Sequence, residues 1–309
     1  MFARFVRCSG FTFGLGLGCL LVSLSWLPAQ ESPSAPAPPG PVKIGLPANL
    51  FRDIPRPTAE ALLPTFGKLM EGQTGMKGQP MLLNNSHEVA QQLVDGKVQL
   101  GVFHGFEFAW AQSQHPELKP LVIAISQNNP YLNAQIVVPA DSSFNKLEDL
   151  KDQQFAIPKG TREHCRLYVF RNCRLLGHKQ DKFFGNISNP PHVTAALDAV
   201  ADGKVQGTVV DGTALENYRW LNPGKSGKLR TLMKSETFPT GVIVYREGGM
   251  PEADLQKFKS GLVTAHQTTN GLQLMMLWKM SRFEVVPADY HQLLSNIVKA
   301  YPPPAGEEP

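Results

Sequence analysis

One predicted helix start carries the densest group of charged and reactive side chains in the sequence. The segment KGTREHCR brings Lys159, Thr161 and Arg162 together directly after a predicted strand at 154–157. A helix N-terminus offers free backbone N–H groups and a partial positive charge, so it suits an anion. A hydroxyl would add a donor, and arginine can bind an oxyanion through two parallel hydrogen bonds. We expect an oxyanion site here, with solvated charges beside a helix cap as the alternative.

A histidine and an aspartate end two related segments. VDGKVQLGVFHG covers 94–105 and ADGKVQGTVVDG covers 201–212, so DGKVQ occurs twice, and the copies end on His104 and Asp211 before a glycine. Each copy predicts a helix end with glycine in the left-handed cap position, followed by a core strand. Ligands of open α/β sheets bind beyond the carboxyl ends of the strands. We therefore expect His104 to donate to an oxyanion, with a buried histidine bonded to backbone as the alternative. Asp211 should hold a ligand cation or orient Arg162.

Four further residues belong to the expected ligand site. Asn85 and Ser86 lie at the turn after the second predicted strand, where Ser86 could also serve as a helix cap. Tyr131 precedes a predicted crossing between lobes and could stack on a ligand or pack as a hinge aromatic. Arg52, after the first predicted strand, is a weaker candidate.

Cysteine and histidine raise two other classes of function. Cys165 beside His164 or His192 could form a nucleophile–base pair, but no nucleophile elbow surrounds it, so we expect no enzyme. A metal- or cation-binding protein is the other alternative, although no histidine or cysteine pair has the close spacing of metal ligands, and we expect no cofactor. The metal reading would gather four residues, His104, His164, His192 and Cys165.

The two cysteines of the predicted globular part lie on a single predicted helix. Cys165 and Cys173 are eight residues apart in TREHCRLYVFRNCRLLG. Eight residues of helix span about 12 Å, beyond the roughly 7 Å at which a disulfide can form. The spacing therefore predicts two free thiols packed on one helical face.

The composition is that of an exported globular protein with little net charge. The chain has 309 residues, of which 42% are hydrophobic and 18% charged, so most of it should fold. A basic start and an apolar run predict a secretory signal at 1–29, with lipidation at Cys19 and membrane tethering as the alternative. Without Arg4 and Arg7, 28 basic residues face 26 acidic ones, which does not favour a nucleic-acid partner. We expect a periplasmic monomer.

Short apolar runs alternate with amphipathic ones along the rest of the chain. This alternation is typical of an α/β fold whose helices cover parallel strands. Thr58 and Ser86 should cap the first two helices, and Pro64 should kink or restart the first. The expected strands are 43–46, 79–83, 98–103, 121–126, 133–140, 154–157, 205–210, 229–233 and 240–245.

The duplicated unit predicts two βαβ lobes joined by a double crossing near Pro130 and Pro239. If the lobes face each other, the carboxyl ends of both sets of strands meet a common ligand cleft. The expected division is a signal segment 1–29, a Pro/Ser-rich spacer 30–41, a first lobe 42–134 with 242–300, a second lobe 135–241 and a disordered tail 301–309.

Three stretches together resemble a known family. NPYLNAQIVVPADSSFNKLEDLKDQQFAIPKGT, HVTAALDAVADGKVQGTVVDGTALE and KLRTLMKSETFPTGVIVYREG are similar, in this order, to the phosphate, phosphite and phosphonate substrate-binding proteins of ABC importers. The wider group includes sulfonate-binding and transferrin-like proteins, and the resemblance covers roughly residues 42–270. It implies the type II periplasmic binding protein fold, with the ligand cleft between two lobes.

The resemblance also implies a function. A small solute that carries an oxyanion, such as a phosphonate or phosphate, would be captured by lobe closure and delivered to a membrane permease and its ATPase. A protein that senses the ligand and reports to a membrane sensor is the alternative. His192 fits the family's helix-starting histidine. The family's Ser-Thr-Ser-Gly turn, however, is replaced by KGTREHCR, which keeps a hydroxyl at Thr161, and its Tyr-x-Ser pattern becomes Tyr131-Leu132-Asn133. The identity of the solute therefore stays open.

Overall fold

The computed structural model describes residues 40–126 and 129–303. The predicted signal segment 1–29, the spacer up to residue 39 and the tail from residue 304 lie outside the described residues. Within the described part, no helix is long and apolar enough to cross a membrane.

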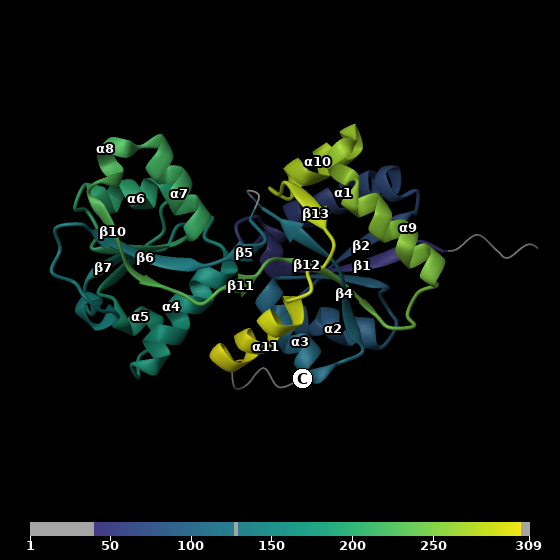
Figure 1. Cartoon of the computed structure of the whole chain (residues 1–309), viewed down its shortest axis with the longest axis horizontal. Helices are drawn as coiled ribbons and strands as arrows, with labels where there is room; N and C mark the ends of the chain where they lie inside the picture. The colour runs from purple at the N-terminus through teal and green to yellow at the C-terminus, as the bar shows by residue number, and fades with distance from the viewer. Residues whose placement is uncertain (1–39, 127–128, 304–309) are drawn as a thin grey trace, which may run out of the picture. The chain divides into compact units, whose positions relative to one another are not determined.

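Two β-sheets organise the described chain, and each is the centre of one lobe (Figure 1). The first lobe is built on a six-stranded sheet with the strand order β13-β4-β12-β3-β1-β2. β1, β2 and β3 run parallel, whereas β12 runs antiparallel to both β3 and β4. The strands are β1 Val42–Pro47, β2 Gly78–Leu83, β3 Leu100–Phe103, β4 Leu118–Ile125, β12 Val242–Arg246 and β13 Arg282–Glu284.

The second lobe repeats this arrangement. Its five-stranded sheet has the order β10-β6-β9-β7-β8, in which β7, β8 and β9 are parallel and β6 is antiparallel to β9 and β10. The second sheet has the same strand order as the first sheet without its edge strand β13. The corresponding strands are β10 and β4, β6 and β12, β9 and β3, β7 and β1, and β8 and β2. The duplication read in the sequence is therefore a duplication of sheet topology. The strands are β6 Ala134–Pro139, β7 Gln154–Ala156, β8 Asn186–Ser188, β9 Gly207–Asp211 and β10 Leu229–Lys234.

Helices cover both faces of each sheet, which explains why the central strands are apolar throughout rather than alternating. Figure 1 shows α1, α9 and α10 on one face of the first sheet and α2, α3 and α11 on the other. In the second lobe α6 and α7 lie on one face, and α4 and α5 on the other. The helices of the first lobe are α1 Arg56–Thr74, α2 Ser86–Val94, α3 Gly105–Gln114, α9 Glu252–Val263, α10 Thr269–Leu277 and α11 Tyr290–Ala300. Those of the second are α4 Glu163–Leu175, α5 Gln180–Phe183, α6 Val193–Ala201, α7 Gly212–Leu221 and α8 Pro223–Ser226, and three 3₁₀ turns lie at Ala48–Phe51, Leu147–Leu150 and Ala265–Gln267.

The repeated DGKVQ segments end α2 and α6 in the same way. Gly96 and Gly203 adopt φ of 70° and 71°, the left-handed conformation that glycine reaches at little cost. The lysine after each glycine then donates its backbone N–H back into the helix, from Lys97 to the carbonyl of Gln92 and from Lys204 to that of Ala199. These bonds satisfy carbonyls at the helix ends, so the predicted glycine caps are confirmed.

The glutamine of each copy joins the segment to the first strand of its own lobe. Gln99 donates its backbone N–H to the carbonyl of Lys43, and its side-chain Oε1 accepts from the N–H of Lys43 at 2.9 Å. Gln206 makes the same two bonds with Gln154, the second at 3.2 Å. The side chain thus supplies the acceptor that a longer strand would have supplied from its backbone. We call this two-bond arrangement the glutamine clamp.

The two lobes are connected by a pair of short strands. β5, Tyr131–Leu132, pairs antiparallel with β11, Phe238–Pro239, at the places where the sequence predicts crossings. The end of the chain packs beside them. Tyr301 accepts at its carbonyl a hydrogen bond from the indole of Trp110 at 2.7 Å, and its hydroxyl donates to the carboxylate of Glu236.

Four local predictions need correction. Tyr301 is 1% exposed, so it does not belong to a disordered tail. α1 begins at Arg56 after Pro55 and not at a Thr58 cap, and it continues through Pro64 without restarting. Asn85, and not Ser86, caps α2, because its side chain accepts from the N–H of Glu88. The sequence did not predict α10 as a separate helix.

Candidate functional site

The carboxyl ends of β3 and β9 form two equivalent elbows. His104 follows β3 as the N-cap of α3, and Asp211 ends β9 as the N-cap of α7, with φ/ψ of −65°/146° and −67°/140°. A glycine comes next in both. A Cβ atom on Gly105 would lie 2.2 Å from the carbonyl oxygen of Pro239, and one on Gly212 would lie 2.3 Å from Asn133 Oδ1. Each elbow therefore packs directly against one of the crossing segments, which only glycine permits.

The first elbow leaves its histidine with a free ring nitrogen. The carboxylate of Glu107 accepts the backbone N–H of His104 at 3.3 Å and the side-chain amide of Asn49 at 2.6 Å, which fixes the elbow. His104 stacks on Phe106, with 5.9 Å between ring centroids. Its Nε2 is buried and has no hydrogen-bond partner among the described residues. The predicted alternative, a histidine satisfied by backbone, therefore does not apply to this nitrogen.

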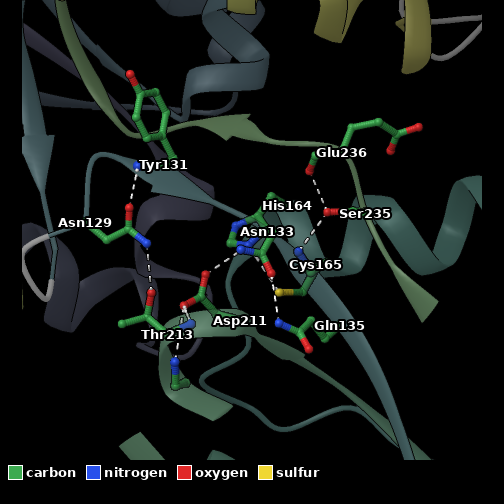
Figure 2. A network of polar contacts seen from close by, with 12 residues as sticks. Asn129, Tyr131, Asn133, Gln135, His164, Cys165, Asp211, Thr213, Ser235 and Glu236 are labelled. Carbon is green, nitrogen blue, oxygen red and sulfur yellow. Dashed lines mark hydrogen bonds and ion pairs between the residues drawn. The ribbon is translucent and has the colours of Figure 1, made fainter. Parts of the chain in front are cut away.

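The side chain of the second elbow, in contrast, binds other residues of the protein. Asp211 is 4% exposed, and its Oδ1 caps α7 by accepting the N–H groups of Thr213 and Ala214. Its Oδ2 lies 3.2 Å from Nε2 of His164, which Figure 2 shows facing it. Among the described residues Asp211 therefore pairs with His164, and not with Arg162 as one of the two expectations from sequence had it.

Burial sets the protonation of this pair. Burial lowers the pKa of His164, against the opposing effect of the Asp211 carboxylate. For Asp211 burial works against ionisation, but the hydrogen bond and charge of His164 hold its pKa below the ordinary value. The adjacent Cys165 is fully buried, and burial raises the pKa of its thiol well above the usual range. Cys165 and Cys173 are both free thiols, as predicted.

The start of α4 supplies the second lobe's contribution to the cleft. Arg162 is its N-cap, with Glu163 and His164 in the first turn. Thr161, directly before it, is 7% exposed, and its Oγ1 has no hydrogen-bond partner among the described residues. A buried hydroxyl without a partner costs about 1–3 kcal/mol, so such a group points to a ligand or a bound water.

An ion pair joins the two lobes at this helix start. Arg52 contacts Glu163 through two hydrogen bonds, Nε to Oε1 at 2.6 Å and the terminal nitrogen to Oε2 at 2.8 Å. The Glu163 hydrogen bond raises the pKa of Arg52. Arg52, a weak candidate from sequence, thus lies in the cleft. Glu163 was not among the predicted site residues, because nothing local in the sequence relates two positions 111 residues apart.

Two adjoining cavities lie where these residues meet. The first has a volume of about 210 Å³ and the second about 310 Å³. Side chains of both lobes line each of them. The residues common to both cavities are Leu50, Phe66, His104, Arg162, Glu163 and Trp278.

Unpaired polar atoms are concentrated at the second cavity. Among the described residues, eight buried side-chain atoms have no hydrogen-bond partner, and four of these belong to residues that line it. The four are Asn49 Oδ1, His104 Nε2, Thr161 Oγ1 and Trp278 Nε1. Four of the residues that line the cavity thus each carry a buried polar atom without a hydrogen-bond partner among the described residues. Trp278, between α10 and β13, was not predicted, because a lone tryptophan in an apolar run usually signals core packing.

The predicted site residues divide into two groups. His104, Thr161, Arg162 and the weaker candidate Arg52 line the cavities, whereas Lys159, Asn85, Ser86, Tyr131, His192 and Asp211 do not line either of them. Lys159 is exposed beside the start of α4, Asn85 caps α2, Ser86 begins α2, and His192 is the exposed N-cap of α6. The repeat register pairs His192 with Asn85, since both are N-caps of the repeated helix.

Tyr131 belongs to the crossing rather than to the cavity lining. Tyr131 is a residue of β5, and its hydroxyl donates a hydrogen bond to the carboxylate of Asp289 at 2.9 Å. This bond raises the pKa of the phenol. Its backbone N–H donates to Asn129 (Figure 2). Tyr131 is 37% exposed, so the described residues place it at the hinge without packing it there.

A metal centre is not supported by the described residues. No three histidine, cysteine, aspartate or glutamate side chains gather there in a way that could hold a metal ion. His104 faces the cavities, His164 pairs with Asp211, and His192 is exposed at α6, so the predicted metal-ligand set is divided among three places.

Comparison with known proteins agrees with this architecture. A family model described as the periplasmic substrate-binding protein of phosphonate ABC transporters matches residues 55–290. No curated protein matches the chain. Among solved structures, a binding protein component of an ABC phosphonate transporter from Pseudomonas aeruginosa is 17% identical over 83% of this chain and 84% of its own, with a TM-score of 0.52.

Two other solved structures show the same fold. PhnD1 from Prochlorococcus marinus, in complex with methylphosphonate, is 16% identical over 84% of this chain and 97% of its own, at a TM-score of 0.52. XAC2383 from Xanthomonas citri, bound to ATP, is 13% identical over 85% and 99%, at a TM-score of 0.55. The described chain thus has the predicted two-lobed α/β fold of type II periplasmic binding proteins.

Proposed function

The chain belongs to the family of periplasmic phosphonate substrate-binding proteins of ABC transporters, and on that premise we propose that it captures a small solute bearing an oxyanion between its two lobes. Proteins of this family are the substrate-binding components of importers and act outside the inner membrane. The proposed partners are accordingly a membrane permease and its ATPase. The predicted signal segment 1–29 would direct export to the periplasm.

One observation carries the proposal. Thr161 from the second lobe and His104 from the first line the same cavity, and each has a buried polar atom with no hydrogen-bond partner among the described residues. An oxyanion can accept hydrogen bonds from both, next to the start of α4, where the helix end and the Arg162 guanidinium favour negative charge. Leaving each group unpaired costs about 1–3 kcal/mol, and this cost is removed when a ligand pairs with both.

Contacts from both lobes would make binding and lobe closure one process. A ligand bridging His104 and Thr161 binds the closed arrangement better than an open one, and it therefore shifts the population toward closure. The Arg52–Glu163 pair already joins the lobes at this point. The lobes proposed to close are residues 42–134 with 242–300 and residues 135–241.

Thermal unfolding of residues 40–303 with and without added solutes tests the proposal. The panel consists of phosphate, phosphite, methylphosphonate, methanesulfonate and divalent metal ions, and phosphonates come first because one similar protein was solved with methylphosphonate. A solute at about 100 times its Kd stabilises the folded state by about 2.7 kcal/mol, which raises Tm by about 5 °C.

Two variants assign the site. Thr161→Val removes the hydroxyl and keeps the shape, so the affinity for the oxyanion should fall about 10-fold or more. Thr194→Val on an exposed position of α6 is the matched control and should bind like the wild type. Stabilisation by metal ions alone, or oxyanion binding that Thr161→Val leaves unchanged, would refute the proposed site.

A further inference from the structure

The smaller of the two cavities is apolar over most of its surface. It extends from the cleft into the first lobe, between α1 and the carboxyl edge of the sheet. The side chains that form this part come from α1, β3, β4, β12 and β13 and include Phe66, Met70, Val102, Ala124, Ile243 and Phe283. A cavity of this kind lowers stability in proportion to its volume, so a fold that keeps one gains from a ligand that fills it.

The charged side chains of this cavity lie where it meets the neighbouring cavity. His104, Arg162 and Glu163 line it there, as they line the neighbouring cavity. Deeper in, the hydroxyl of Thr240 already donates to the carbonyl of Ala124 and is not available. The indole of Trp278 contacts Phe51 and Phe66, each at 5.3 Å between ring centroids, and lines both cavities. The combined space therefore has one charged end and one apolar end.

The apolar end is large enough for a specific chemical group. The whole cavity, of which this end is the larger part of the lining, has a volume of about 210 Å³, compared with the roughly 150 Å³ of an engineered apolar cavity that binds benzene. A phenyl ring or a short alkyl chain would fit, whereas a methyl group would leave most of the volume unfilled. Methylphosphonate and inorganic phosphate are therefore poor matches in size.

We infer that the solute is an amphiphilic organic oxyanion, with its anionic group at Thr161 and His104 and an alkyl chain or aromatic ring in the apolar cavity. This inference rests on the proposed function, since it names the substrate class of the same cleft. The replacement of the family's hydroxyl-rich turn by KGTREHCR agrees with it, because only one hydroxyl, that of Thr161, remains to bind the anion. Contacts with the apolar cavity would then contribute to the choice of solute, in place of the missing hydroxyl groups.

Calorimetric titration of residues 40–303 with a homologous series tests the inference. The ligands are methyl-, butyl- and hexylphosphonate, the matching sulfonates, and hexan-1-ol as a chain without an oxyanion. Each methylene that enters the cavity should strengthen binding about threefold to fourfold, so with all five additional methylenes buried hexylphosphonate or hexanesulfonate should bind roughly 200- to 1,000-fold more tightly than its methyl analogue. Hexan-1-ol should bind far more weakly than either.

A variant that fills the cavity gives an independent readout. Ala124→Leu adds volume at the sheet side of the cavity, so hexyl ligands should lose about 10-fold or more in affinity while methyl ligands keep theirs. Ala61→Leu makes the same change on an exposed position of α1 and serves as the control. If Ala124→Leu does not fold, the chain-length series on the wild type still decides.

The outcomes separate this inference from the proposed function. Equal affinity for methyl and hexyl oxyanions would overturn the amphiphilic substrate and leave oxyanion capture standing. Binding of hexan-1-ol as tight as that of hexylphosphonate would overturn the role of the anionic group, and with it the proposed function. Absence of binding by every member of both series would overturn both.

Discussion

The elbow after β3 and the elbow after β9 have the same backbone and different chemistry. Both follow a glutamine clamp, both begin a helix, and both bring a glycine against a crossing segment. The Nε2 atom of His104 is buried and has no hydrogen-bond partner among the described residues. The carboxylate of Asp211, in contrast, accepts two backbone N–H groups and pairs with His164. The repeated residues thus build the frame, and the residue at the elbow itself, His104 in one copy and Asp211 in the other, decides whether the elbow lines the ligand cavity.

This comparison explains why DGKVQ occurs twice. Its glycine ends a helix, its valine is buried in the core, and its glutamine ties the segment to the first strand of the lobe. None of these tasks involves a ligand. A conspicuous repeat in a binding protein is therefore a guide to where the strands end, and the residues just beyond the repeat are the ones to test.

The largest expected effect comes from adding a methyl group to the elbow glycines. Gly105→Ala would place its Cβ 2.2 Å from the backbone oxygen of Pro239, which cannot move without shifting the crossing, so we expect a loss of about 3 kcal/mol or more in the free energy of unfolding. Gly212→Ala meets the side chain of Asn133, which can rotate, and should cost about 1–2 kcal/mol. Urea denaturation measures both. Equal losses would show that the two elbows are equally rigid.

Removing the side chain at each N-cap should separate structure from binding. Asp211→Ala loses a helix cap and leaves His164 without its buried partner, so unfolding should become easier by about 2–3 kcal/mol. His104→Ala removes the ring that stacks on Phe106 but no hydrogen bond of Nε2 to a described residue, so it should destabilise less than Asp211→Ala, while it weakens oxyanion binding. Denaturation and calorimetry together provide the two readouts. The contrast fails if His104→Ala destabilises as much as Asp211→Ala.

The smallest effect should come from the glutamine clamps, where the two lobes should respond alike. Gln99→Ala and Gln206→Ala each remove one hydrogen bond to a first strand, at a cost of about 1 kcal/mol. Gln79→Ala, at an exposed position of β2, controls for the loss of a glutamine in a strand. Urea denaturation measures the change in the free energy of unfolding, and the dependence of that free energy on urea concentration should stay unchanged. If only one of the two substitutions lowered the free energy of unfolding, the two glutamine clamps would not be equivalent.

The sequence predicted the fold better than the site, for a physical reason. Strands, helix caps and glycine turns depend on neighbours a few residues away, so their patterns are visible in the chain itself. The capping error at Ser86 is one of register, because the adjacent Asn85 can cap a helix equally well, whereas α1 begins after Pro55 with no side-chain cap at all. The duplication was visible because both copies keep the same local residues.

The site depends on contacts that no local pattern contains. Arg52 meets Glu163, and His164 meets Asp211, only because the two lobes and the two sides of one sheet bring them together. Trp278 lines the cavity from the last part of the chain. His104, Thr161 and Arg162 could be predicted because each follows the carboxyl end of a strand, the one long-range rule that an α/β topology provides.

The two buried cysteines have a practical consequence for watching the lobes move. Thiols react with maleimide dyes as thiolates, and burial raises the pKa of Cys173 to about 12 and that of Cys165 well above its usual range. Neither native thiol in the described part of the chain should therefore take up label while the protein is folded. One cysteine introduced on the surface of each lobe would carry a donor and an acceptor dye without background. The distance between the dyes would then report closure as it happens.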